Sequence, residues 1–245
     1  MNTSRTQHIF FWTLVVMSIF TLSAPTLVVL GASFTSGNII QFPPDGFSLK
    51  WYWAIIGEQH LRDAFVRSLQ VAVICVLISL PTGTLAGIAL SKYVIRGGNA
   101  IQVYLLLPFT IPLIGSGIGL MLFFGQIGIL GNLWPVGIAT AVINIPFMIW
   151  AVSSSAASLD PDLELAAMSC GAGPVQTFFN VTLPAVMPGV ITGSLLMFIL
   201  SLNEFLVSLL LVDARIVTLP VQIYNSIRSI ITPVSYTHLT LPTTS

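Results

Sequence analysis

The chain has 245 residues, of which 55% are hydrophobic and 7% charged, and its formal net charge is zero. Because soluble domains carry about 25% charged residues, too few polar side chains are available to cover a water-soluble surface, and this class is excluded. Zero net charge gives no indication of nucleic-acid binding, and Cys75 and Cys170 form neither a disulfide framework nor a metal-binding C-x-x-C spacing.

Five segments are long and apolar enough to be membrane-spanning helices. A helix needs about 20 mostly apolar residues to cross a bilayer. Backbone polar groups in hydrocarbon must be bonded internally, so these segments are predicted as helices rather than open strands. In chain order they are 9–34, 69–90, 101–124, 134–155 and 188–212. The third and fourth are separated by a predicted turn at 125–132, which contains three glycines and an asparagine. The sequence therefore predicts an all-α polytopic membrane protein.

The segment 46–65, between the first two spans, is rich in aromatic residues and mixed in charge. Trp51, Tyr52 and Trp53 suit the level of the lipid headgroups, so a short interfacial helix is predicted here. A ligand-binding role for these aromatic residues is the alternative.

A polar segment interrupts the apolar sequence after the fourth predicted span. Residues 97–159 carry no charge, and Asp160, Asp162 and Glu164 then follow within five positions. Asp160 before Pro161 predicts a helix start, because Asp accepts a hydrogen bond at the N-cap and proline at the first helical position loses no needed donor. Asp162 and Glu164 then lie in the first turn, where the helix dipole favours acids.

Gly171 and Pro174 are predicted to separate this helix from a second short one. Gly171 suits the left-handed residue that ends a helix, and Pro174 suits the first position of the next. Apolar residues share one face of each helix: Leu163, Ala166, Ala167 and Cys170 on the first, and Val175, Phe178 and Phe179 on the second. Such faces are covered either by a partner protein or by lipid and the chain's own spans, and physical chemistry alone leaves these alternatives equal.

Residues 163–190 read "LELAAMSCGAGPVQTFFNVTLPAVMPGV". An Ala-Ala pair, a glycine after three further residues and an aliphatic-x-Leu-Pro after nine more occur at Ala166, Ala167, Gly171, Val181, Leu183 and Pro184. This pattern closely resembles the cytoplasmic loop signature of permease subunits of binding-protein-dependent ABC importers, which begins E-A-A. The position of that glutamate is occupied by Leu165, and the nearest acid is Glu164. A salt bridge that the family assigns to the glutamate is therefore not transferred to this chain.

The resemblance extends along most of the chain, from "FSLKWY" through "SLNEFLVSLLL" to "TLPVQIYNSIR", and looks most like the spermidine/putrescine-type permeases. It implies the type I ABC importer permease fold, with a transmembrane permease domain over 1–233 and a cytoplasmic coupling loop over 156–187. It also implies a multi-pass protein of the bacterial cytoplasmic (inner) membrane that forms the translocation path for a polyamine. Permeases of this kind for iron, thiamine or molybdate are the alternatives.

In such importers the loop docks on a separate ATPase subunit. The chain has no G-x-x-x-x-G-K-[ST] sequence for a phosphate-binding loop, so it is not predicted to be an enzyme. The implied partners are a dimer of ABC ATPase subunits, a second and related permease, a periplasmic or lipid-anchored substrate-binding protein and membrane lipid, with no cofactor, metal or nucleic acid. The implied coupling residues are Asp160, Leu163, Glu164, Ala166, Ala167, Met168, Gly171, Phe178, Phe179, Leu183 and Pro184. Asp160 is the cap of the first helix, Gly171 the hinge, and the apolar residues the contact faces.

Asn203 and Glu204 lie within the fifth predicted span. An ionisable group at the centre of a membrane helix costs roughly 2.5–3.5 kcal/mol on insertion scales, so it is expected to face a cavity or a partner. One interpretation places both side chains on the translocation path, where a carboxylate suits a polyamine cation. The other is a hydrogen bond between helices or a gate contact indifferent to substrate.

The last residues, 234–245, resemble a translated sequencing-library adapter and are set aside as a non-native tail. With that tail removed, a sixth span expected from the resemblance is missing. A natural polar terminus is the alternative.

Two other functional classes of membrane protein would have different sequence features. A secondary transporter would work without an ATPase and would more often place ionisable residues in several spans. A membrane-embedded enzyme needs a catalytic constellation, and His8, His60 and His238 form none within the predicted spans.

Overall fold

The computed structural model describes residues 5–37, 43–44, 46–93, 95–213 and 216–237, with side chains described from residue 7 to 228 except at 99, 102, 106 and 109. The chain divides into two units, 1–59 and 60–245. In the first unit, α1 (Arg5–Ser33) is followed by the short helix α2 (Lys50–Gly57).

Aromatic contacts join the two helices of the first unit. The ring of Phe34 stacks on Phe47 with centroids 4.8 Å apart and lies 5.6 Å from the ring of Tyr52. The Tyr52 hydroxyl is hydrogen-bonded to Ser33 Oγ at 2.6 Å. A short helix in 46–65 was predicted, and α2 covers residues 50–57 of this segment, whereas residues 59–65 already belong to α3 (Gln59–Lys92).

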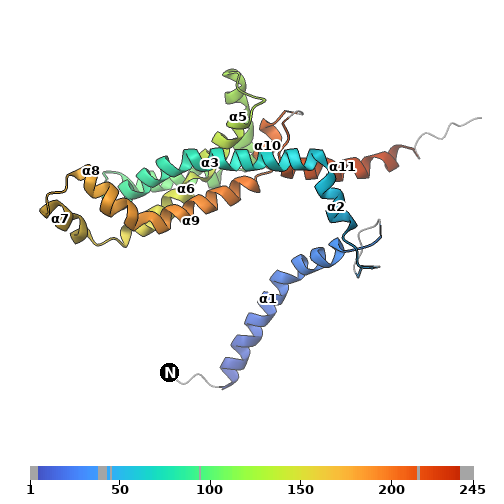
Figure 1. Cartoon of the computed structure of the whole chain (residues 1–245), viewed down its shortest axis with the longest axis horizontal. Helices are drawn as coiled ribbons and strands as arrows, with labels where there is room; N and C mark the ends of the chain where they lie inside the picture. The colour runs from blue at the N-terminus through green and yellow to red at the C-terminus, as the bar shows by residue number, and fades with distance from the viewer. Residues whose placement is uncertain (1–4, 38–42, 45, 94, 214–215, 238–245) are drawn as a thin grey trace, which may run out of the picture. The chain divides into compact units, whose positions relative to one another are not determined.

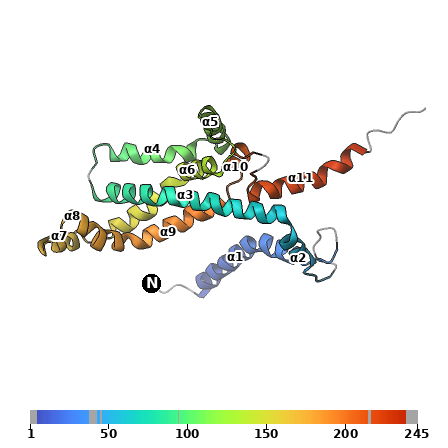
Figure 2. The same ribbon diagram turned by 45° about the horizontal axis from the view of Figure 1, so that its top comes forward.

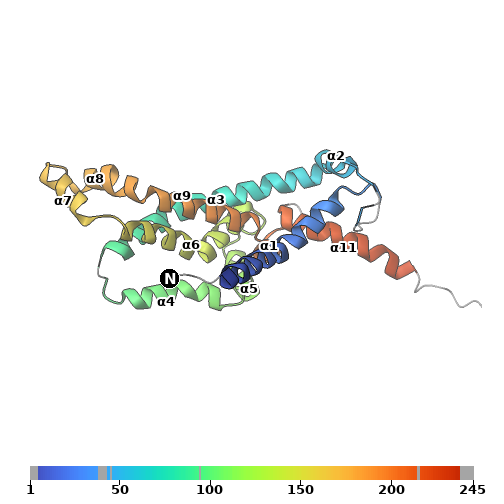
Figure 3. The same cartoon turned by 90° about the horizontal axis from the view of Figure 1, so that it is seen from below.

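The second unit is built on three long helices, α3, α6 (Leu133–Ala157) and α9 (Leu183–Leu202), which run side by side (Figure 1). Two further apolar helices, α4 (Gly98–Thr110) and α5 (Leu113–Gln126), lie between α3 and α6 in sequence, and α4 runs alongside the bundle in Figure 2. The short helix α7 (Pro161–Ser169) and α8 (Pro174–Thr177) lie at one end of the bundle (Figure 3).

Within the described residues, four helical segments are long and apolar enough to cross a membrane: Gln7–Ser33, Gln59–Lys92, Leu133–Ala157 and Pro174–Leu202. The predicted spans 69–90 and 134–155 lie inside α3 and α6. The predicted turn at 125–132 joins α5 to α6, and Gly128 and Gly131 both adopt positive φ there.

The predicted third span, 101–124, is not one helix. The helix α4 ends at Thr110, Ile111 is extended (φ −85°, ψ 130°), and α5 begins after Pro112. Proline disfavours helical conformation in the residue before it and lacks an N–H to continue the ladder. Hydropathy is high on both sides of Pro112, so a hydropathy window joins two helices that the backbone separates.

The predicted fifth span, 188–212, also differs. The helix begins earlier, because α8 continues through the π-helical turn η1 (Phe178–Thr182) into α9 without a break, and it ends at Leu202. A separate short helix, α10 (Leu206–Leu211), follows. The next segment forms α11 (Leu219–Thr237), which is joined to α3 by a 2.8 Å hydrogen bond from the Leu219 N–H to Ser68 Oγ. Residues 238–245 of the predicted non-native tail lie outside the described residues, and its origin stays a prediction.

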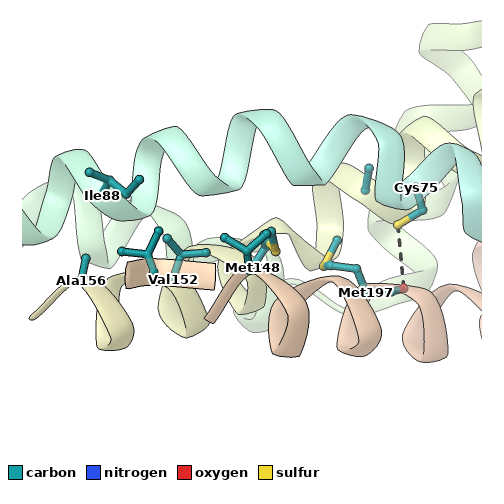
Figure 4. Close-up of a cluster of buried hydrophobic side chains, with 9 residues drawn as sticks. Cys75, Ile88, Met148, Val152, Ala156 and Met197 are labelled. Carbon is teal, nitrogen blue, oxygen red and sulfur yellow. Dashed lines mark hydrogen bonds between the residues drawn. The ribbon is translucent and has the colours of Figure 1, made fainter. Parts of the chain in front are cut away.

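Met148 is at the centre of the bundle core. Its side chain is fully buried between α3 and α9, in a cluster that is drawn in Figure 4. A Cβ atom at Gly83 would lie 2.5 Å from Met148 Cγ, and one at Gly193 would lie 2.4 Å from Met148 Sδ. The helices therefore approach closely because glycines face this methionine. The other members of the cluster are Cys75, Ile88, Ala141, Val152, Ala156, Val186, Val190 and Met197.

Candidate functional site

The start of α7 has the cap that its sequence predicts. Asp160 is extended (φ −69°, ψ 119°), and its Oδ1 accepts a 3.0 Å hydrogen bond from the N–H of Asp162, with Pro161 at the first helical position. This bond satisfies one of the backbone donors that a helix start leaves unpaired. The prediction for the N-cap is confirmed.

The end of α7 depends on Gly171, which has φ +91°, as predicted. The Gly171 N–H donates to the carbonyl of Met168 at 2.9 Å, and the Ala172 N–H donates to the carbonyl of Ala167 at 3.1 Å. These two bonds are those of a Schellman motif, which closes a helix through a left-handed residue. The direction in which the chain leaves α7 is therefore set by a backbone conformation that glycine adopts without strain.

Glu164 connects α7 to the bundle. Its Oε1 accepts hydrogen bonds from Lys92 Nζ, at the end of α3, and from Thr182 Oγ1, at the end of η1. The Lys92 and Glu164 side chains are 21% and 18% exposed. Partial burial opposes ionisation, but the hydrogen bonds from Lys92 and Thr182 and the charge of Lys92 outweigh it. The pKa of the Glu164 carboxyl is therefore lowered from its ordinary value.

The contact of Glu164 with Lys92 and Thr182 divides the predicted apolar face of α7. Leu163 and Met168 are 52% and 47% exposed, Ala166 is also exposed, and no residue of α7 is buried. Ala167 is half-buried, on the same side as Glu164. Leu165, which occupies the position of the family's glutamate, is 59% exposed. The outer surface of α7 thus presents several exposed apolar side chains, whereas its partly buried contact with the bundle at Glu164 is polar.

The second predicted helix is not separate from the span that follows it. Phe178 is partly buried against the Met148 cluster, as is Leu183, whereas Phe179 is 58% exposed. The two phenylalanine rings meet edge to face at 5.1 Å. Adjacent residues of a helix point about 100° apart, so Phe178 and Phe179 do not form the common outward face that was predicted. Pro184 is exposed beside Leu183.

Glu204 is not in the middle of a helix. It lies in the break between α9 and α10, half-buried, and its Oε1 accepts a 3.0 Å hydrogen bond from the Val207 N–H. Asn203 is exposed, and its Nδ2 donates to the carbonyl of Ile199 at 2.9 Å. Glu204 therefore caps the first turn of α10, a local role that the interpretation from sequence did not include. Both residues stay candidates for the translocation path.

Lys92 and Thr182 are contacts of the site that sequence reasoning missed. Lys92 is 72 residues from Glu164, and Thr182 is 18 residues from it. One available signal is that Lys92 is the first charged residue after the uncharged stretch 68–91. Within the described part of the chain, no group of three or more His, Cys, Asp or Glu side chains has the placement of a metal site.

Comparisons with known proteins agree with this architecture. Residues 79–243 match the family model described as "Binding-protein-dependent transport system inner membrane component". The chain is 29% identical to the putrescine transport system permease protein PotI of Escherichia coli K12 over 91% of its length and 82% of the relative's. It is 30% identical to the molybdenum transport system permease protein ModB of Mycobacterium tuberculosis H37Rv, over 71% of each chain.

The fold also matches a solved structure. A bacterial ABC transporter involved in the import of the acidic polysaccharide alginate contains a chain that aligns with a TM-score of 0.70 and 22% identity. The alignment covers 98% of this chain and 86% of the other. At this identity the match shows a shared fold.

Proposed function

Because this chain belongs to the family of inner-membrane components of binding-protein-dependent transport systems, and is the permease of an ABC importer, we propose that α7 is the element on which a separate ATPase acts. The observation that carries this proposal is the exposed apolar surface of a helix whose backbone is capped at both ends. Leu163, Leu165 and Met168 are each about half exposed outside the long helices. An exposed apolar surface on an ordered element is typical of a protein interface.

The proposed contact surface contains fewer residues than the motif alone implies. Leu163, Ala166, Met168 and Phe179 remain on it because they are exposed. Phe178 and Leu183 pack instead against the bundle core. Pressure on the outer side of α7 would therefore reach the core through these packed residues and Glu164.

Crosslinking tests the proposed contact. Cys170 is exposed and Cys75 is buried, so a Cys170→Ser background leaves no exposed native thiol. In this background Leu165→Cys is expected to crosslink to the ATPase subunit in membranes that contain the whole importer. The matched control is Leu195→Cys, which is 58% exposed on α9 within a long apolar helix and is expected to contact lipid. Crosslinks from Leu165→Cys that reach only lipid or the chain itself would contradict the proposal.

The substrate that best fits the relatives is a polyamine. PotI and the spermidine/putrescine transport system permease protein PotC of Escherichia coli K12, 28% identical over 86% of the chain, support this assignment, and ModB supports molybdate as the alternative. The test is uptake of labelled putrescine and molybdate by cells that express the whole importer that contains this chain. Saturable putrescine uptake is expected, and uptake of molybdate alone would select the alternative.

A further inference from the structure

We propose that Glu164 is a positioning residue, a latch that holds α7 against the ends of two core helices and does not itself contact the ATPase. This inference rests on the proposed role of α7. No residue of α7 is buried, so apolar burial supplies little of its stability. Its caps order the backbone but do not attach it to the bundle.

Lys92 and Thr182 place the latch on rigid elements. Lys92 is the last residue of the 34-residue helix α3, and Thr182 is 3% exposed at the junction of η1 and α9. Both donate to the same carboxylate oxygen of Glu164. One side chain of α7 is therefore bonded to two helices of the bundle at once.

The contact has the properties of a strong interaction. Hydrogen bonds between ionised groups are about twice as strong as neutral ones. The pair is mostly shielded from water, so salt screens it less than an exposed surface pair. The π-helical turn that presents Thr182 is of a rare type that occurs frequently at functional sites.

Asp162 lies in the same first turn of α7 but is exposed, and its carboxylate has no role in this contact. On the other side, Arg96 is exposed four residues beyond Lys92. These two residues offer matched controls, because each carries the same charge as a latch residue on nearly the same part of the chain.

The test measures hydrogen exchange of the α7 amides and substrate uptake in membranes with the whole importer. Glu164→Gln and Lys92→Gln should each speed hydrogen exchange of the α7 amides by about tenfold. Loss of a hydrogen bond between charged groups changes the equilibrium between closed and open states by about this factor. The double variant should be no worse than either single one, and the exchanged pair Glu164→Lys/Lys92→Glu should recover protection and uptake. Thr182→Val, which keeps the buried volume, should have a smaller effect of the same sign.

The controls Asp162→Asn and Arg96→Gln should leave both readouts at the wild-type level. The proposal is overturned if Glu164→Gln lowers uptake while Lys92→Gln does not and the exchanged pair fails to recover, because Glu164 would then act on another chain. Unchanged exchange in both single variants also overturns it.

Crosslinking from Leu165→Cys is measured in the same membranes. Absence of that crosslink in otherwise wild-type protein would contradict the proposed contact of α7 with the ATPase. The hydrogen-exchange results test the latch at Glu164 separately.

Discussion

The bundle core and α7 are neighbouring parts of one structural unit, yet different interactions hold them in place. In the core, glycines of α3 and α9 let a fully buried Met148 fill the space between helices. The helix α7 buries no residue, and its place is set by a cap, a left-handed glycine and one shared carboxylate. The core should therefore be sensitive to added volume, and α7 to lost hydrogen bonds and to backbone conformation.

The largest effect is expected in the core, at Gly189. A Cβ atom there would lie 2.6 Å from the carbonyl oxygen of Ala151, a backbone atom that cannot move without its helix. Gly189→Leu should destabilise the bundle by more than about 3 kcal/mol, above the usual overpacking range. The measurement is the amount and thermal stability of the protein in detergent. Gly119→Leu is the control, since a Cβ atom at Gly119 meets nothing within 4 Å in this chain. An equal loss of thermal stability in both variants would contradict the view that the core is especially sensitive to added volume.

The second effect should separate transport from stability. Gly171 has φ +91° and an open surrounding, so Gly171→Val meets no steric contact but opposes the left-handed backbone at a cost of about 1–3 kcal/mol. Uptake should be lost at a normal membrane level. Gly173→Val is the matched control, because Gly173 is extended (φ −73°, ψ 165°) and precedes a proline, where such a backbone is favoured. Normal uptake by Gly171→Val would exclude the hinge.

The third effect concerns pH. The pKa of Glu164 is lowered in the folded protein, so its ionised form stabilises α7 above the ordinary carboxyl pKa, and this stabilisation is lost as pH falls through the lowered value. Protection of α7 should exceed that of Glu164→Gln at about pH 7. The difference should shrink as pH falls below the ordinary carboxyl pKa and disappear below the lowered pKa of Glu164. A difference between the two proteins that stays constant with pH would show that the carboxylate charge has no part in the latch.

The smallest effect is expected at Glu204, where charge and capping can be separated. Glu204→Gln keeps an oxygen that accepts from the Val207 N–H, whereas Glu204→Ala loses the cap at a cost of about 1 kcal/mol. If the carboxylate lines the translocation path, Glu204→Gln should weaken uptake of a cationic substrate more than that of a neutral one. Equal weakening of both would assign Glu204 to the local cap alone.

Much of the fold follows from features that act over a few residues. The apolar segments predict the long helices, and Asp160 and Gly171 predict both ends of α7, because each is a local interaction between a side chain or φ angle and the nearest backbone groups. The same local reasoning extended two predicted spans, 101–124 and 188–212, across breaks between helices. Hydropathy does not change at Pro112, and Glu204 was read as a buried charge rather than as a cap.

The sequence by itself determined an all-helical membrane protein with a short capped helix between two spans, since helix formation and termination depend on neighbouring residues. Only the tertiary structure decided that Phe178 faces the core, that glycines of two helices receive Met148, and that Glu164 meets Lys92 from 72 positions away. The physical reason is that these contacts join distant segments. Their geometry depends on how whole helices pack, which no local pattern of residues specifies.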